Sequence, residues 1–88
     1  MAPSNEPIFC EVVVVAAEIR RDCTARIDPD CWQGHKAPPE LAGVLDLPKA
    51  EWRLLASLER LTLTLKSTGE PYRMILDAGT GRFLARRL

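Results

Sequence analysis

The sequence lacks an excess of charge of either sign. It has 12 lysines and arginines and 12 aspartates and glutamates in 88 residues, so its formal net charge is zero. No overall field would draw it to nucleic acid or to an anionic membrane. However, residues 1–50 carry eight acids and five bases, whereas residues 51–88 carry four acids and seven bases. This asymmetry indicates a polyanion-facing end or head-to-tail self-association.

Long apolar segments are also missing. The apolar run at residues 8–17 contains Glu11 and is far too short to cross a bilayer. Residues 1–7 have two prolines and none of the positive charge that opens an export signal. The three cysteines, an odd number, do not form a disulfide framework. We therefore expect a cytoplasmic protein with no membrane partner, consisting of a flexible leader (1–7) and a single α+β domain (8–88).

Catalytic motifs are not visible. The sequence has no glycine-rich phosphate loop, no nucleophile elbow and no paired-carboxylate motif. Because His35 is the only histidine, Cys31 is the one cysteine that could use it as a base, and Gly34 opposes the helical turn that would join them. We expect a protein that is not an enzyme and holds no cofactor.

Cys23, Cys31 and His35 are the only cluster of metal-ligand residue types. Their spacing, C-x7-C-x3-H, lacks the closely paired ligands of structural zinc sites. We expect core cysteines and a loop thiol with no metal, and metal binding by the three residues remains the alternative.

The first half of the chain predicts one strand and then an ambiguous segment. Residues 8–15 are β-branched and almost continuously apolar, which is typical of a central strand covered on both faces. Residues 16–27 fit either a helix or a strand, and we favour a hairpin that turns near residues 21–22. The segment VVVVAAEIRRD resembles the opening hairpin of Nudix hydrolases, which supports the hairpin. The glutamate-rich Nudix box is missing, so the resemblance implies no catalytic role.

Residues 28–46 contain five prolines and glycines and predict a loop with at most one helical turn near residues 39–42. Trp32 lies in this loop. It either covers the edge of a small core, which we favour, or is an exposed anchor for a partner.

The strongest helix signal covers residues 46–60. Asp46 is suited to the N-cap and Pro48 to the first turn, and Trp52, Leu55 and Leu58 recur at helical spacing, so they should face the core.

The segment LDLPKAEWRLLASLERL, residues 45–61, is similar to the recognition helix of winged-helix repressors. The resemblance implies that Lys49 and Arg53 meet DNA. Against it, Glu51 and Glu59 leave the helix nearly neutral, and no preceding helices complete a trihelical core.

The last third predicts a three-stranded meander, with strands at 61–66, 72–76 and 82–88. A tight last turn pairs Leu76 with Phe83, Ile75 with Leu84, Met74 with Ala85, and Arg73 with Arg86. Matching apolar residues on the other pair of strands places Leu65 beside Tyr72, Leu63 beside Met74, and Leu61 beside Leu76.

This register gives the sheet two unlike faces. The apolar face, on which we expect the helix, has Leu61, Leu63, Leu65, Tyr72, Met74, Leu76, Phe83 and Ala85. The other face has Thr62, Thr64, Lys66, Arg73, Ile75, Arg82, Leu84 and Arg86. Two arginines directly opposite each other destabilise a sheet by up to about 1 kcal/mol. A carboxylate, Glu70 or Asp77, or an external anion should offset this repulsion.

The sequence alone does not establish a function. We expect an α+β fold, a mostly antiparallel sheet with one main helix on one face. The preferred function is a small non-enzymatic protein-interaction or homo-oligomeric module. The alternative is binding of nucleic acid or another polyanion through the basic C-terminal sheet or the helix at 47–60. The candidate binding residues are Lys66, Arg73, Arg82, Arg86 and Trp32.

Overall fold

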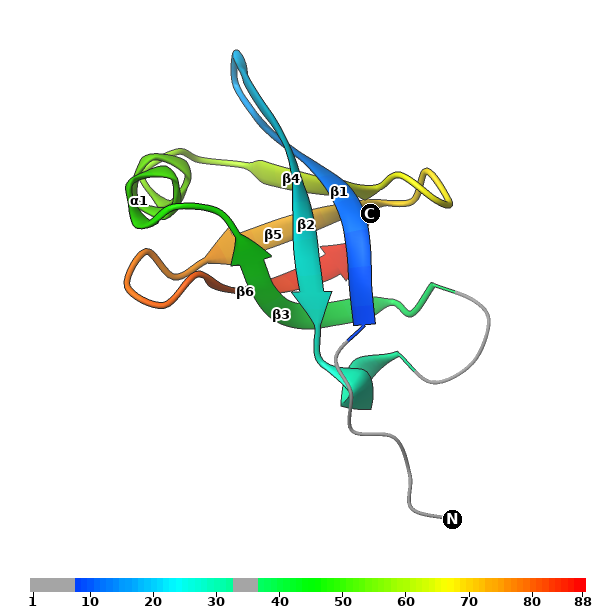
Figure 1. Ribbon diagram of the computed structural model, residues 1–88. Helices are drawn as coiled ribbons and strands as arrows, with labels where there is room; N and C mark the ends of the chain where they lie inside the picture. Colours follow the sequence, from blue (N-terminus) through cyan, green and yellow to red (C-terminus); the bar gives the residue numbers. More distant parts are fainter. Residues whose placement is uncertain (1–7, 33–36) are drawn as a thin grey trace.

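The computed structural model describes residues 8–32 and 37–88, so the leader predicted for residues 1–7 lies outside the described residues. The described chain forms a closed barrel of six antiparallel strands with one short α-helix (Figure 1). The strands are β1 (Ile8–Ala16), β2 (Ile19–Ile27), β3 (Glu40–Asp46), β4 (Leu61–Leu65), β5 (Pro71–Leu76) and β6 (Arg82–Arg87). The helix α1 spans Lys49–Ala56, and a 3-10 turn, η1, spans Pro29–Cys31.

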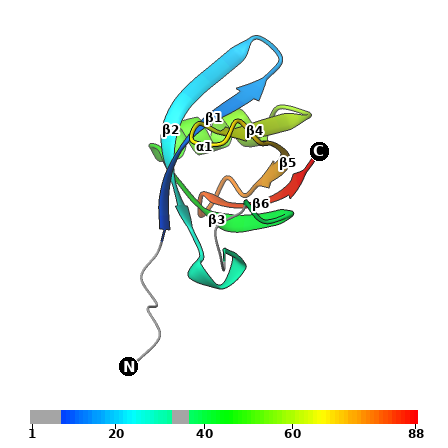
Figure 2. The same ribbon diagram turned by 90° about the vertical axis from the view of Figure 1, so that its right-hand side faces the viewer.

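The barrel consists of two three-stranded meanders that face each other. Strands β1, β2 and β3 form the first and β4, β5 and β6 the second, and the pairs β1–β4 and β3–β6 join them (Figure 2). The expected α+β sheet with a helix packed on one face is therefore wrong. An eight-residue helix is too short to cover three strands, and the apolar face of the second meander is covered by the first meander instead.

Alternate residues of every strand point into the barrel and form the core, as expected for a closed sheet. The largest fully buried side chains are those of Tyr72, Phe83, Ile27, Leu41, Leu45, Leu55, Leu63, Leu65, Val12 and Val14. Tyr72 is the polar exception in this set, and its hydroxyl donates a hydrogen bond to the Pro38 carbonyl oxygen at 2.6 Å.

The hairpin predicted for the first two strands is present, but its turn is not at residues 21–22. The chain turns at residues 17–18, because Ala16 pairs with Ile19 and Ala17 adopts a positive φ of 52°. Alanine rarely takes this conformation, so the residue type gives no turn signal. The expectation that this strand is covered on both faces is also wrong, since Phe9 is 67% exposed on the outside.

Strand β3 lies where the sequence predicted a loop. Leu41 and Leu45 point inward on either side of Gly43, which is buried. A β-carbon at position 43 would overlap the carbonyl oxygen of Arg26 on β2, so the glycine permits the close approach of two backbones. Gly43 is therefore part of a strand and not of the loop that the sequence predicts.

The helix is shorter than predicted. Asp46 ends β3 rather than capping the helix, and Pro48 is the N-cap residue. The predicted inner face is confirmed: Leu55 is fully buried, and Trp52 and Leu58 pack against the core. The described residues contain no other α-helix, so they do not form the trihelical core of a winged-helix domain.

The predicted register is confirmed between β5 and β6, including the pairs Leu76–Phe83 and Arg73–Arg86. Between β4 and β5 it is wrong by two residues, because Leu63 pairs with Tyr72. Gly69 has a φ of 76°, and its N–H donates to the Leu65 carbonyl oxygen at 2.7 Å. This tight turn sets the register, whereas matching leucines alone could not, since a shift of two residues keeps every side chain on its face.

Candidate functional site

A groove of about 760 Å³ lies along β3, β6 and β5. Its lining is mostly apolar, and four charged side chains accompany the apolar ones. The lining residues are Cys31, Glu40, Leu41, Ala42, Arg73, Ile75, Leu84, Ala85, Arg86, Arg87 and Leu88. A concave surface of this size is in the range of ligand sites.

The strand register arranges the outer residues of the groove in two rows. One row crosses the sheet as Ala42, Leu84 and Ile75, each directly opposite the next. Ile75 is 74% exposed and Leu84 is 64% exposed, so two large aliphatic side chains lie side by side in water. Ile75 and Leu84 therefore form an apolar stripe that nothing in the described chain covers, whereas Ala42, at the end of the row, is half-buried beside Cys31.

The second row is charged and consists of Glu40, Arg86 and Arg73. Arg86 lies 3.4 Å from the Glu40 carboxylate, and both side chains are largely exposed. Arg73 forms no ion pair among the residues that the structure describes. The row therefore contains two adjacent arginines and one carboxylate.

The carboxylates predicted to offset the arginine pair are not the ones that do so. Neither Glu70 nor Asp77 forms an ion pair with these arginines within the described ranges. The Asp77 carboxylate instead accepts hydrogen bonds from the Gly79 N–H and the Thr80 hydroxyl within its own turn. Glu40 was missed because its strand was assigned to a loop.

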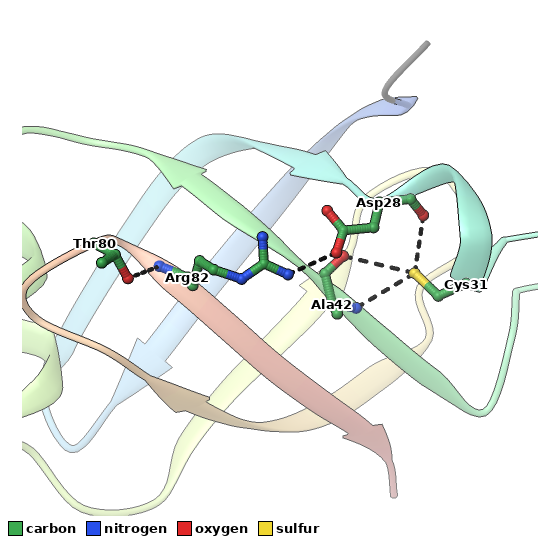
Figure 3. A network of polar contacts seen from close by, with 5 residues as sticks. All are labelled: Asp28, Cys31, Ala42, Thr80 and Arg82. Carbon is green, nitrogen blue, oxygen red and sulfur yellow. Dashed lines mark hydrogen bonds and ion pairs between the residues drawn. The ribbon is translucent and has the colours of Figure 1, made fainter. Parts of the chain in front are cut away.

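Arg82 lies outside the groove lining and is held in a network that reaches two lining residues, Cys31 and Ala42 (Figure 3). Its guanidinium donates to the Asp28 carboxylate at 2.7 Å. The Cys31 thiol donates to the Asp28 carbonyl oxygen at 3.0 Å, and the Ala42 N–H donates to the Cys31 sulfur at 3.4 Å. These contacts fix the turn η1 against β3, next to the groove.

Two predicted site residues lie elsewhere. Lys66 is 3.6 Å from the Asp22 carboxylate and lines a separate small hollow with Glu11 and Cys23. Trp32 is half-buried and packs against the core, as in the favoured interpretation of a core-edge residue. The structure therefore brings together Arg73 and Arg86 and leaves Lys66, Arg82 and Trp32 out of the groove lining.

Two of the three cysteines, Cys10 and Cys23, are poorly suited to nucleophilic chemistry at neutral pH. Burial, followed by the carboxylates of Asp22 and Asp46, raises the pKa of Cys23 to about 11. Burial also raises the pKa of Cys10. A thiol is nucleophilic and binds metals as the thiolate, so these shifts oppose both roles.

The described ranges contain no group of three histidine, cysteine, aspartate or glutamate side chains that could hold a metal ion. His35, the third residue of the predicted cluster, lies outside these ranges.

Signals for the missed residues are present in the sequence. The alternation of Leu41, Gly43 and Leu45 is a strand pattern, and it places Glu40 and Ala42 on the opposite face. Once this strand is recognised, the pairing of β3 with β6 is the one further fact needed to place Glu40 beside Arg86.

Within the described residues, no helix is both long enough and apolar enough to traverse a lipid bilayer. Comparison of the chain with models of known protein families, with curated proteins and with solved structures gave no match. A function must therefore be inferred from the groove itself.

Proposed function

We propose that this protein is a small non-enzymatic interaction module that binds an acidic segment of a partner protein in the groove over β3, β6 and β5. The bound segment carries large apolar side chains. The observation that supports this most is the exposed pair Ile75 and Leu84 beside Arg73, an arginine with no ion-pair partner in the described chain.

The apolar stripe supports binding of a protein. Single exposed apolar residues are normal on protein surfaces, but contiguous ones rimmed by polar groups mark interaction sites. Ile75 and Leu84 are directly opposite on neighbouring strands, and the exposed Leu88 lines the same groove. A partner that buries these side chains gains about 25 cal/mol per Å² of apolar surface removed from water.

The residue types in the groove favour a peptide over nucleic acid. Surfaces that bind single-stranded nucleic acid combine basic residues with aromatic side chains on which the bases stack. Among the described residues that line the groove there is no aromatic side chain, and the exposed apolar side chains are aliphatic. Three arginines around an apolar centre instead suit carboxylates next to aliphatic side chains.

The shape of the site favours a narrow segment over a second copy of the chain. A twofold dimer through this face would place one concave groove against an identical one. Two hollows facing each other leave a void, and packed interfaces exclude such voids. A single segment can fill one groove.

Display of random 12-residue peptides against the immobilised protein tests the proposal. We expect selection of peptides that combine large aliphatic residues with aspartate or glutamate, and loss of their binding in Leu84→Glu. Phe9→Glu is the matched control, because Phe9 is similarly exposed (67% against 64%) but lies outside the groove lining.

Failure to select peptides, or equal binding to both variants, would overturn the proposal. Two further measurements identify the competing functions. Dimerisation seen by light scattering and lost in Leu84→Glu would favour a homo-oligomer. DNA or RNA binding at physiological salt that is lost in Arg73→Glu would favour a polyanion-binding protein.

A further inference from the structure

We infer that Arg73 and Arg86 together bind one carboxylate of the docked segment, and that Glu40 competes with this carboxylate for Arg86. The inference rests on the proposed function and names the chemistry that the groove recognises.

The first step is the position of the two arginines. Arg73 and Arg86 are directly opposite on β5 and β6, and both side chains point to the outer face. Directly opposite β-carbons in an antiparallel pair are about 4.5–5.5 Å apart. Two guanidinium groups at this spacing can each donate to one oxygen of the same carboxylate. Such a carboxylate would also remove the repulsion between the two arginines.

The second step is the weakness of the present contact with Glu40. The Glu40–Arg86 pair has a separation of 3.4 Å, and its side chains are 68% and 81% exposed. Ion pairs of this kind stabilise a protein little. The Asp28–Arg82 pair differs, because its separation is 2.7 Å and the Asp28 backbone is held by further hydrogen bonds. A ligand can therefore displace Glu40 from Arg86 more easily than it can displace Asp28 from Arg82.

The third step is the order of residues along β6 and directly after its last residue, Arg87. Leu84, Arg86 and Leu88 alternate at a spacing of two, so an apolar group lies on each side of the arginine. A segment that covers both leucines shields the ion pair from water and strengthens it. The ligand that fits this order is an acidic residue with a large aliphatic residue two positions away on each side.

Two synthetic peptides test the inference: acetyl-Leu-Ser-Glu-Ser-Leu-amide and its counterpart with glutamine in place of glutamate. Their affinities are measured from the amide chemical shifts of the 15N-labelled protein. We expect the glutamate peptide to bind about 5-fold more tightly, since hydrogen bonds to a charged group are stronger than neutral ones. The shifts should centre on the backbone amides of β3, β5 and β6 that line the groove.

Variants of the protein separate the two roles. Arg73→Gln should remove the preference for glutamate, whereas Glu40→Gln should increase affinity for the glutamate peptide severalfold and leave the glutamine peptide unchanged. Arg53→Gln is the control, because Arg53 is an exposed arginine on α1 outside the groove lining.

The outcomes distinguish this inference from the proposed function. If both peptides bind in the groove with equal affinity, the arginine pair does not recognise a carboxylate, but the groove still binds peptides. If Glu40→Gln fails to tighten binding of the glutamate peptide, Glu40 is not a competitor. If neither peptide shifts the groove amides, the inference is wrong; failure of peptide display would then also remove the proposed function.

Discussion

Gly43 on β3 and Arg26 on β2 approach so closely that a β-carbon on residue 43 would overlap the Arg26 carbonyl oxygen. Gly43 and the next residue, Val44, each pair with both neighbours of β3, and the partners of Gly43 are Ile27 of β2 and Phe83 of β6. The strong curvature of β3 in Figure 1 lets this one strand complete both ladders. The absence of a side chain at position 43 is therefore a requirement for barrel closure at this point.

Gly43→Ala should destabilise the protein by about 1 to 3 kcal/mol, because two backbones must move apart to accommodate the methyl group. The free energy of unfolding from urea titration, followed by tryptophan fluorescence, measures the effect. Gly79→Ala is the control, since a β-carbon there has the Asp77 carboxylate oxygen as its nearest contact, at 3.4 Å. Equal unfolding midpoints for the two variants would show that β2 and β3 can accommodate a methyl group at position 43 without loss of stability.

Leu55→Ala should destabilise the protein by about 2 to 5 kcal/mol, because it leaves a cavity in the core. Leu55 is fully buried, whereas its neighbour Leu54 is 37% exposed. Leu54→Ala removes the same atoms from the same helix and should have a clearly smaller effect in the same urea titration. A similar loss for both variants would refute the burial of this face of α1.

Trp52→Phe tests how α1 is held to the barrel. The Trp52 indole N–H donates to the Leu45 carbonyl oxygen at 3.0 Å, and the ring lies so close to Gly81 that a β-carbon there would overlap it. Loss of the hydrogen bond should lower the free energy of unfolding by about 1 kcal/mol. In hydrogen exchange, the substitution should increase the exchange rates of the α1 amides more than those of the β6 amides. An unchanged exchange rate for α1 would mean that the hydrogen bond does not hold the helix.

Stability should fall in alkaline solution. The pKa of Cys23 is raised to about 11, whereas a thiol in the unfolded chain titrates near 8.5. The unfolded chain therefore loses this proton first as the pH rises, so the stability associated with Cys23 is present below about pH 8.5 and is lost towards pH 11. The raised pKa values of Cys10 and Tyr72 act in the same direction.

Urea midpoints measured between pH 7 and pH 11 test this expectation. Cys23→Ser removes one titrating group, so its midpoint should fall less steeply over this range than that of the wild-type protein. The thiol of Cys23 should also react slowly with iodoacetamide at pH 8. Identical pH profiles for the two proteins would contradict the raised pKa.

Local patterns in the sequence were sufficient for part of the fold. The turn between β5 and β6 is tight, so counting outward from it gives the correct pair Arg73–Arg86. Between β4 and β5, leucines at every second position fit two registers equally well, and the turn at Gly69 decides between them. The turn at Ala17 has no sequence signal, because alanine seldom adopts its φ.

Barrel closure could not be derived from these patterns. It depends on the pairing of β1 with β4 and of β3 with β6, and neither pair is joined by a short turn. For the same reason the sequence indicated the arginine pair and the exposed Ile75 and Leu84 but not Glu40, whose position relative to Arg86 follows from the β3–β6 pairing. The alternation of side chains along the strand predicted for residues 61–66 places Lys66 on the face of the arginines, whereas the structure ends β4 at Leu65 and places Lys66 near Asp22.

The joining of two meanders also has a consequence for how fast the protein folds. Glu40 and Arg86, which face each other across β3 and β6, are 46 positions apart in the chain. The chain must lose the entropy of closing such a long loop before the stabilising contacts between the strands can form. Folds dominated by pairings of this kind form in milliseconds to seconds. Stopped-flow refolding should therefore show its main phase in this range. Refolding that is complete within microseconds would mean that the pairing of strands from the two meanders does not limit the folding rate.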